Sequence, residues 1–254
     1  MKVLLAQKFD PAKHNVDGWL ASEKLDGMRA YWNGTSLLSR NGNPIAAPDW
    51  FVAGLPRNQH FDGELFLGRG KFQKTMSVCR KQSPVDSEWR AIRFMVFDVP
   101  DHPGTFRQRY AVLRKLCGKL PDHIVCVEHS ETTTAEVPAM LAKLEAVGAE
   151  GVMLRDPNSN YERKRSKSLL KVKSFLDADA TVIGHQPGIG RHRGRMGALL
   201  CLLDAATEFA IGTGFTDAAR EDPPVIGDRI TFTFFELTKA GVPRFPAFAG
   251  VRGD

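Results

Sequence analysis

Short runs of alternating apolar and polar residues recur along most of the chain, and this period of two is the pattern that most limits its fold. Successive side chains of a β-strand point to opposite faces, so such runs predict strands with one buried face. We expect strands at 28–32, 61–66, 93–99, 124–128, 151–154, 169–173, 180–184, 197–203, 208–211 and 229–236. The chain is therefore predicted to be rich in β-sheet.

Two segments show helical spacing instead. Thr105 is a suitable N-cap for the first helix, which Gly118 would end. Its apolar face comprises Phe106, Tyr110, Leu113 and Cys117. The second follows Thr134, must hold Pro138 in its first turn and precedes Gly148. Its apolar residues are Val137, Met140, Leu141, Leu144 and Val147. Strands and helices together predict an α+β fold class.

The pattern changes after Lys173. Residues 177–254 consist of short strands separated by glycine- and proline-containing turns, with no long helix predicted. This is typical of a small β-barrel. We therefore predict two domains, with the boundary near Ser174–Asp177. Residues 1–174 would form antiparallel sheets with flanking helices, and 175–254 the barrel.

The composition excludes disorder as the main state and favours an anionic partner. Of the 254 residues, 43% are hydrophobic and 25% charged, which is ordinary for a globular protein. The net charge is +6 and the sequence pI is about 9.2. A basic balance indicates a polyanion such as nucleic acid, although a solubilising basic surface is the alternative.

The sequence shows no membrane span and no secretory signal. No apolar run reaches the roughly 18 residues that a spanning helix needs, and Met1–Lys8 holds only a short apolar stretch. We expect a cytoplasmic protein as the chain is given, or a periplasmic one if a leader was removed. The four cysteines lack zinc-site spacing and are expected to be buried thiols; they are Cys79, Cys117, Cys126 and Cys201.

The motif EKLDGMR at 23–29 is the first with chemical content. Lys24 becomes a nucleophile if its surroundings lower its pKa. Gly27 permits a tight turn or close approach to a ligand, and Arg29 offers a planar fork for phosphate or ribose oxygens. The carboxylate of Asp26 lies between Lys24 and Gly27 in the sequence. A turn with solvated charges is the alternative interpretation of this motif alone.

Four later segments carry similar chemistry: FDGEL at 61–65, FMVFDV at 94–99, EGVML at 150–154 and LLKVK at 169–173. They place carboxylates at Glu64 and Glu150 and an aromatic ring at Phe97. Lys171 and Lys173 would point to one face of a strand, which is costly unless an anion lies between them. Taken singly, each residue is more often part of a core, an ion pair or a solvated face.

The order of these segments resembles that of the covalent nucleotidyltransferases, and specifically the ATP-dependent DNA ligases. The resemblance covers nearly the whole chain. It implies an adenylation domain followed by an OB-fold β-barrel. The chain looks like the minimal two-domain ligases of bacteria and viruses, including the Lig E type.

The resemblance implies a reaction in three steps. Lys24 takes AMP from ATP and releases pyrophosphate, the AMP passes to the 5′-phosphate of a nick, and the 3′-hydroxyl then displaces it. Lys171 and Lys173 would neutralise the α-phosphate. Glu150 is the expected Mg²⁺ ligand, with Mn²⁺ as a substitute, and Asp26 would position the lysine or the metal.

Other positions match nucleotide and DNA contacts of the family. Glu64 and Arg29 match residues that contact ribose, and Phe97 matches the ring that stacks on adenine. Arg40 matches the position that holds the 5′-phosphate of the nick.

The C-terminal segment 243–254 resembles ligase motif VI. This implies that Arg244 and Arg252 approach the ATP tail when the second domain closes. The family often has a lysine after the aspartate that here is Asp254, the last residue of the sequence.

Two basic clusters are expected to contact the DNA backbone without reading its sequence. They comprise Arg163, Lys164, Arg165 and Lys167, and Arg191, Arg193 and Arg195. Exposed turns without a partner are the alternative. The expected substrate is nicked double-stranded DNA, with no obligatory protein partner, and the expected form is a monomer. Only 23 residues precede Lys24, which favours ATP over NAD⁺ as cofactor.

Two alternatives stay open at this point. An RNA ligase or an mRNA-capping guanylyltransferase would use the same lysine chemistry, with a preference for nicked RNA or for GTP. A catalytically inactive DNA-binding module would keep the fold without the reaction, although the intact Lys24 favours an enzyme.

Overall fold

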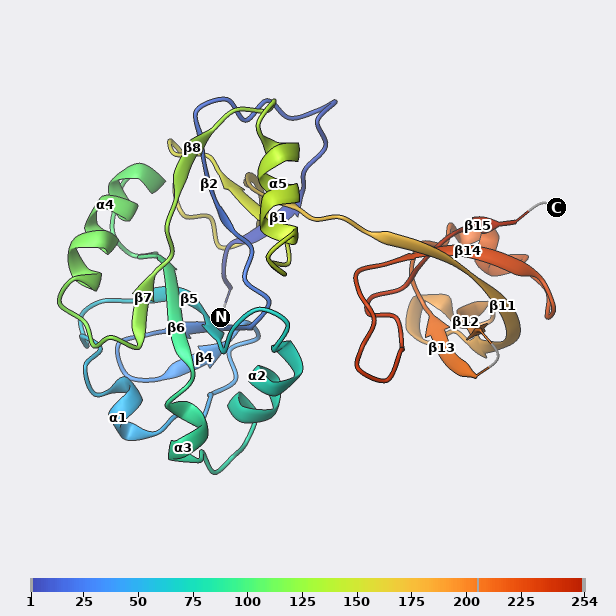
Figure 1. Ribbon diagram of the computed structural model, residues 1–254, viewed down its shortest axis with the longest axis horizontal. Helices are drawn as coiled ribbons and strands as arrows, with labels where there is room; N and C mark the ends of the chain where they lie inside the picture. The colour runs from blue at the N-terminus through green and yellow to red at the C-terminus, as the bar shows by residue number, and fades with distance from the viewer. Residues whose placement is uncertain (1, 205, 253–254) are drawn as a thin grey trace. The chain divides into compact units, whose positions relative to one another are not determined.

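The structure is a computed structural model that describes residues 2–204 and 206–252. The chain divides into two compact units, Met1–Lys173 and Ser174–Asp254. Figure 1 shows the first unit as two sheets with helices on their outer sides and the second as a mainly β unit. No helix among the described residues is long and apolar enough to cross a membrane.

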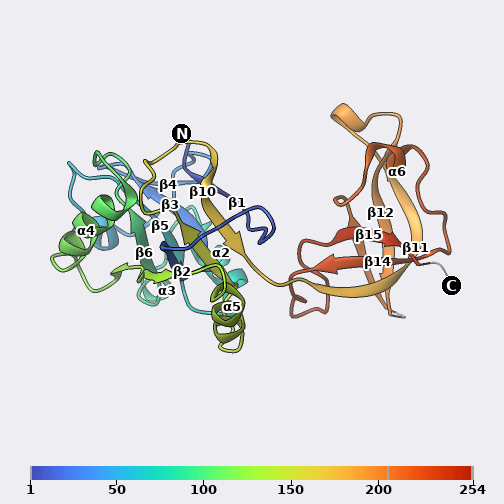
Figure 2. The same ribbon diagram turned by 90° about the horizontal axis from the view of Figure 1, so that it is seen from above.

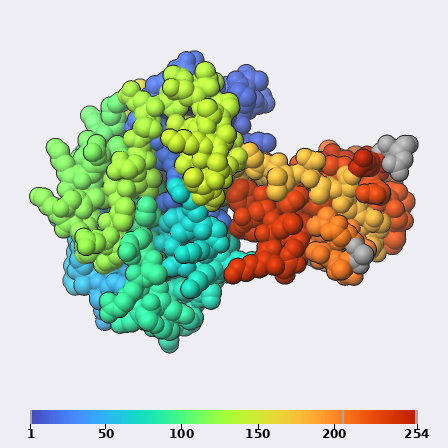
Figure 3. Space-filling model, viewed as in Figure 1, coloured from blue at the N-terminus to red at the C-terminus, as the bar shows by residue number. Residues whose placement is uncertain are grey.

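The first sheet of unit 1 has the strand order β1-β10-β9-β2-β8. Its strands are β1 (Leu5–Lys8), β2 (Trp19–Glu23), β8 (Ser130–Thr132), β9 (Val152–Arg155) and β10 (Arg165–Val172). Helix α5 (Val137–Glu145) covers one face, where Val137 packs in a core cluster with Val152, Leu154 and Leu170. In Figure 3 the side chains of α5 form part of the outer surface of this unit.

The second sheet has the order β4-β3-β5-β6-β7. Its strands are β3 (Met28–Trp32), β4 (Leu37–Ser39), β5 (Phe61–Phe66), β6 (Arg93–Asp98) and β7 (Ile124–Cys126). Its helices are α1 (Asp49–Val52), α2 (Phe72–Cys79), α3 (Asp86–Trp89) and α4 (Phe106–Cys117). The largest core cluster lies here and includes Phe51, Trp89, Phe94 and Leu113, all fully buried.

Unit 2 is a single five-stranded sheet with the order β13-β12-β11-β14-β15. Its elements are β11 (Leu176–Pro187), β12 (Met196–Leu203), β13 (Thr207–Ile211), β14 (Arg229–Phe234), β15 (Ala247–Val251), the 3₁₀ turn η1 (Gly190–His192) and α6 (Asp217–Glu221). The long β11, visible in Figure 2, pairs with β14 through 176–181 and with β12 through 181–187. Among the described residues the strands form no closed barrel, but a bridge from Thr213 to Ala247 links the two edges.

The sequence predicted the most regular elements well. The expected strands 28–32 and 61–66 match β3 and β5, and the helix after Thr105 matches α4. The sheets are mainly antiparallel, as expected, but β1 runs parallel to β10 and β6 parallel to β7. Gly118 ends α4 in a right-handed conformation, so its lack of a side chain is not required there. None of the four cysteines forms a disulfide bond, and two of them are only half-buried.

A buried ionic network connects the two sheets of unit 1. The Asp98 carboxylate at the end of β6 accepts hydrogen bonds from Arg109 Nε and Nη2 on α4, at 2.7 and 3.1 Å. It also accepts one from Arg155 Nη2 on β9, at 2.9 Å. Arg109 Nη1 donates to the carbonyl oxygens of Gly104 and Ser159. Because the Arg109 side chain is fully buried, this network satisfies charges that water cannot reach.

We expect Arg109→Met to lower the free energy of unfolding of unit 1 by about 3–5 kcal/mol, because it leaves the buried Asp98 carboxylate short of a partner. All four tryptophans, residues 19, 32, 50 and 89, lie in unit 1, so their fluorescence during urea unfolding measures this unit.

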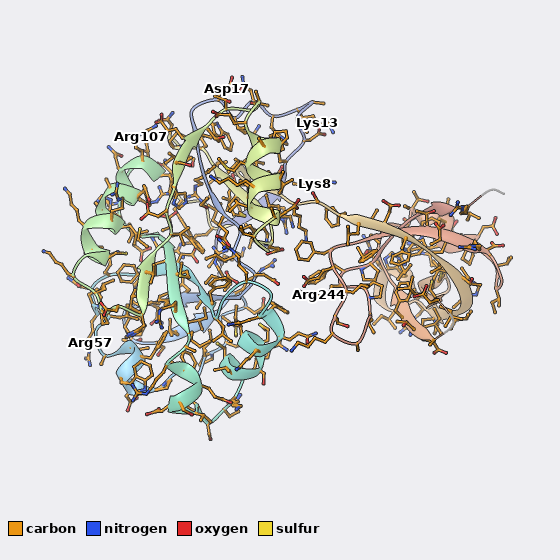
Figure 4. All side chains as sticks on the ribbon, in the orientation of Figure 1. Lys8, Lys13, Asp17, Arg57, Arg107 and Arg244 are labelled. Atoms are coloured by element: carbon orange, nitrogen blue, oxygen red, sulfur yellow. The ribbon has the colours of Figure 1, made fainter. Side chains whose placement is uncertain are left out.

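Arg107→Met is the matched control. Arg107, labelled in Figure 4, lies on the same helix but pairs with Glu131 at the surface, where both side chains are more than half exposed. We expect a change below about 1 kcal/mol. Equal losses in the two variants would contradict a special role for the buried network.

Candidate active site for nucleotidyl transfer

Lys24 lies at the end of β2, where its backbone N–H bonds the carbonyl oxygen of Gly151 at 2.9 Å. Its Nζ contacts the Glu150 carboxylate, which also faces Lys173 Nζ at 3.6 Å. Glu150 is buried, so one carboxylate separates two ammonium groups in a partly desolvated site. Gly151 is required here: at φ +150° a Cβ would lie 2.2 Å from the Val172 carbonyl oxygen.

Lys171 adds a third ammonium group to this region. It lies on β10, directly opposite Met153 of β9 in the strand register. Burial lowers the pKa of both Lys171 and Lys173, and repulsion from Lys24 lowers each further. The site therefore has an excess of positive charge in partly desolvated surroundings, which suits a bound polyphosphate.

Arg29 is held on the facing sheet. Its Nε and Nη2 donate to the two oxygens of Asp62 at 2.6 Å each, and its guanidinium stacks on the Phe97 ring at 4.7 Å. Tyr161 donates a hydrogen bond to the same carboxylate at 2.5 Å. The Asp62 carboxylate raises the pKa of Arg29 above its usual value, against the effect of burial. Arg29 is thus a fixed cation beside the aromatic ring.

Glu64 lies opposite Arg29 in the β3–β5 pairing. Burial raises the pKa of Glu64 to about 8, and the Arg29 and Lys24 cations oppose this shift. At neutral pH the carboxyl group is therefore largely protonated and can donate a hydrogen bond as well as accept one. The residue before β3 lies directly against β5, because a Cβ on Gly27 would lie 2.3 Å from the Leu65 carbonyl oxygen.

Most of these groups line one cavity of about 280 Å³ between the two sheets of unit 1, whereas Glu150 and Lys173 are not among its lining residues. Its lining includes Lys24, Arg29, Arg40, Glu64, Phe97, Arg165 and Lys171. Six of these were singled out in the sequence as candidates for nucleotide chemistry or nick binding, and Arg165 as part of a basic cluster. The cavity brings lysines and apolar rings together, as a nucleotide with its phosphates and base requires.

Neither Asp26 nor Glu150 is among the residues that line the cavity; Asp26 is half-buried, and Glu150 is buried in contact with Lys24, which does line it. In the described part of the chain, no three or more His, Cys, Asp or Glu side chains gather in a way that could hold a metal ion. Glu150, the metal ligand expected from the sequence, contacts Lys24 Nζ beside the cavity. A Mg²⁺ ion held by one carboxylate and substrate phosphates is compatible with this arrangement.

The first basic cluster is divided between two environments. Arg163 pairs with Asp101 at 2.6 Å and bonds the Tyr31 hydroxyl at 3.2 Å. Lys164 pairs with Glu162 at 3.0 Å. Arg165 bonds the Ala6 carbonyl oxygen and lines the nucleotide cavity.

A second hollow, which we call the basic groove, lies beside the cavity and has a volume of about 530 Å³. Its lining comprises Gln7, Lys13, His14, Asn15, Trp19, Asp156, Glu162, Lys164, Arg165, Ser166, Lys167 and Ser168. Arg165 lines both hollows. Lys167 lies where β10 leaves its register with β1, since Ala6 pairs with Ser166 but Gln7 with Leu170. The groove thus combines exposed lysines with the aromatic side chain of Trp19.

The remaining candidates lie in unit 2 and are described within it. Arg191 and Arg193 are exposed at η1, whereas Arg195 lies 3.3 Å from Glu221 and 3.4 Å from Asp217 of α6. In the segment resembling motif VI, Arg244 pairs with Glu236 and Arg252 with Asp179. Figure 4 shows Arg244 in the connection between β14 and β15. The final Gly253 and Asp254 lie outside the described residues.

Sequence reasoning missed several residues of the cavity. Asp62 and Asp98 lie within the motifs FDGEL and FMVFDV, so the sequence could locate them. It could not show that both carboxylates are buried and hold arginine side chains. Met153 is the apolar residue of EGVML on the face of β9 that lines the cavity. His129 and Arg155 also line it, and no sequence motif distinguishes either residue from those around it.

Comparisons with known proteins agree with this geometry. Residues 4–173 match the family model of the ATP dependent DNA ligase domain, and residues 187–252 match that of the DNA ligase OB-like domain. A DNA ligase of Haemophilus influenzae is 38% identical over 244 residues, covering 92% of this chain and 86% of that protein.

Two solved structures are similar over nearly their whole length. A structure from a study of Lig E DNA ligases has a TM-score of 0.90 and 37% identity, covering 99% of both chains. The Chlorella virus DNA ligase–adenylate has a TM-score of 0.58 and 27% identity, covering 100% of this chain and 99% of its own. The family models, the identity and the shared fold agree, and the chain therefore belongs to the ATP-dependent DNA ligase family.

Proposed function

We propose that this chain seals nicks in duplex DNA with Lys24 as the residue that carries AMP. The observation that carries the proposal is the position of Lys24 against Glu150, in the same cavity as Lys171 and Phe97. In this family a lysine takes AMP from ATP and passes it to the 5′-phosphate of the nick. The 3′-hydroxyl then forms the phosphodiester bond and AMP leaves.

In the first step a bond forms between Lys24 Nζ and the α-phosphorus while the bond to pyrophosphate breaks. Nζ attacks as the neutral amine, so its ammonium proton must leave first, and the Glu150 carboxylate, which accepts a hydrogen bond from Nζ, is the group that receives it. The second proton, lost as the N–P bond forms, passes to solvent. Glu150 thus aims the nucleophile. Lys171 and Lys173 stabilise the charge that develops on the phosphate oxygens, which is the main requirement of phosphoryl transfer.

Glu150 is also the proposed contact for Mg²⁺ or Mn²⁺, together with the ATP phosphates. Such an ion would neutralise phosphate charge when bound. Asp26 stays a second candidate for this contact.

The other end of the nucleotide would lie between Phe97 and Met153, since both line the cavity from opposite sheets. Stacking of a base on an aromatic ring stabilises binding by about 1–3 kcal/mol. Glu64 and Arg29 would contact the ribose, and a protonated Glu64 can donate to a hydroxyl oxygen.

DNA would contact the basic groove and Arg40. The groove adjoins the nucleotide cavity through Arg165, so a strand lying in it ends near the reacting phosphate. Arg191 and Arg193 are proposed backbone contacts of unit 2, while Arg244 and Arg252 are proposed to reach the ATP tail. The proposed chemistry needs no second subunit, and we expect a monomer.

The first prediction from the proposed function concerns Lys24. Incubated with α-³²P-ATP and Mg²⁺ without DNA, the protein should show a covalent AMP band on a denaturing gel. Lys24→Ala and Lys24→Arg should both lose the band by more than about 1,000-fold, because Arg keeps the charge but supplies no nucleophilic amine. Lys143→Ala, at an exposed site on α5, is the control and should label normally.

Labelled GTP and nicked RNA distinguish the related enzymes. Protein as purified can already carry AMP, so it is first treated with pyrophosphate. A band that survives in Lys24→Ala, or none in the stripped wild type with any nucleotide, contradicts the proposal.

The second prediction concerns the basic groove. Replacing both Lys164 and Lys167 by alanine should weaken binding to nicked DNA. The slope of log K against log salt should fall by about 1.8, because each lysine–phosphate contact contributes about 0.9 to it. Arg114→Ala with Lys115→Ala removes the same charge from the exposed end of α4. An equal decrease of the slope in this control would show that only net charge matters.

The third prediction concerns Glu64. Its pKa of about 8 in the folded protein lies above the ordinary 4.5, so the folded state holds the proton more tightly. Wild-type stability should therefore fall, relative to Glu64→Gln, as pH rises from about 5 to 8, and the difference should then level off. Tryptophan fluorescence in urea at a series of pH values measures it. A difference that does not change with pH would contradict a buried, protonated Glu64.

A further inference from the structure

One row of side chains crosses the first sheet of unit 1 along the floor of the cavity. Lys171, Met153 and Ser22 lie opposite one another on β10, β9 and β2. The pairing of Ala21 with Ser130 places His129 next in this row, and all four residues line the cavity. The row thus runs from a lysine at the phosphate end, through a methionine, to a histidine at the opposite end.

The imidazole of His129 is fixed by its neighbours. It packs edge-on against the rings of Phe106 and Tyr110, at centroid distances of 5.2 and 4.7 Å. Its Nδ1 lies 2.9 Å from the Val127 carbonyl oxygen. A carbonyl oxygen only accepts hydrogen bonds, so Nδ1 carries the proton. Separately, the Tyr110 hydroxyl accepts a hydrogen bond from the His129 backbone N–H at 3.0 Å.

The ring is neutral under physiological conditions. The pKa of His129 is lowered to about 4, chiefly by burial and to a smaller extent by the nearby Arg155 cation. The hydrogen bond to Val127 and the charge of Asp98 oppose this shift. With Nδ1 protonated and the ring neutral, Nε2 is an acceptor only. No hydrogen bond of Nε2 is found among the described residues, which leaves a fixed acceptor at this end of the cavity.

The nucleotide can lie along the row in one direction only. Its phosphates belong beside Lys24 and Lys171, where the positive charge is concentrated. A base between Phe97 and Met153 then points the edge furthest from the ribose toward His129. In adenine that edge carries the 6-amino group, a donor, whereas guanine has the acceptor O6 there.

We propose that His129 Nε2 accepts a hydrogen bond from the 6-amino group of adenine and thereby selects ATP over GTP. This inference rests on the proposed function, because it takes the cavity to be the nucleotide site. His129 is a specificity residue and takes no part in the chemical step. Guanine O6 would face the Nε2 lone pair, and two acceptors repel and stay unpaired.

The test uses the full chain and the rate of Lys24 adenylylation with ATP, GTP and purine riboside triphosphate, which lacks only the 6-amino group. For wild type, the second-order rate constant of adenylylation should be about 10-fold lower with purine riboside triphosphate than with ATP, which is the value of one hydrogen bond. It should be lower still with GTP. In His129→Ala, the rate constant with ATP should fall to that with the analogue, and the rate constant with the analogue should fall no more than about 2-fold.

Two conservative variants separate recognition from structure. Asn at 129 reproduces the Nδ1–H donor to Val127 but offers nothing at the position of Nε2. Gln reaches the position of Nε2 with an acceptor but gives up the contact with Val127. We expect His129→Gln to keep discrimination against the analogue and His129→Asn to lose it, whatever their effects on stability.

The outcomes distinguish this inference from the function on which it rests. If the wild type forms no covalent nucleotide on Lys24, the proposed function fails. If the wild type forms it but His129→Ala and His129→Asn still discriminate about 10-fold against the analogue, another group reads the base and the inference is overturned. Discrimination that follows the acceptor, through His and Gln but not Ala or Asn, supports it.

Discussion

Unit 1 depends on a single buried carboxylate. Asp98 binds Arg109 of α4 and Arg155 of β9, and so connects the second sheet to a helix on its outside and to the first sheet. Phe97 precedes it in the same strand, so an anchored Asp98 also fixes the ring proposed to stack on the base. Burial keeps His129 neutral, and the Arg155 charge acts in the same direction. The separation of the two sheets, and hence the width of the cavity, is set by an ionic contact that water does not reach.

Positive charge is in excess around Lys24, at the end of the cavity that is proposed to bind phosphate. Three ammonium groups, on Lys24, Lys171 and Lys173, are offset there chiefly by Glu150. Burial and mutual repulsion lower the pKa of the latter two lysines, so a polyanion entering the cavity relieves unfavourable interactions rather than only adding contacts. The arrangement is costly without its ligand, which is typical of a site built for a charged substrate rather than for stability.

The sequence predicted what local patterns encode and missed what the tertiary fold creates. Strands β3 and β5 and helix α4 follow from periodicity and a cap, and the ordered motifs located Lys24, Glu64 and Phe97. Strand β2 was missed because its apolar residues Trp19, Leu20 and Ala21 are consecutive and do not alternate with polar ones, although Lys24 directly follows it. The role of Arg109 could not be predicted, since a lone arginine in an amphipathic helix is normally solvated. His129 is brought to the cavity only by the pairing of β8 with β2.

The arginines of the segment resembling motif VI are both ion-paired within unit 2, and this affects what they can do. Arg252 is more than half exposed, so water screens its side of the pair with Asp179, which keeps a hydrogen bond from Thr231 when Arg252 leaves. Arg244 has a side chain only 10% exposed, with Phe235 and Phe245 against its guanidinium. Moving it would break its contact with Glu236, whose side chain is 41% exposed, and would also remove the guanidinium from the two rings. If both arginines reach the ATP tail as proposed, Arg244 must also give up its packing against Phe235 and Phe245, so it accounts for the larger part of the free-energy cost of that step.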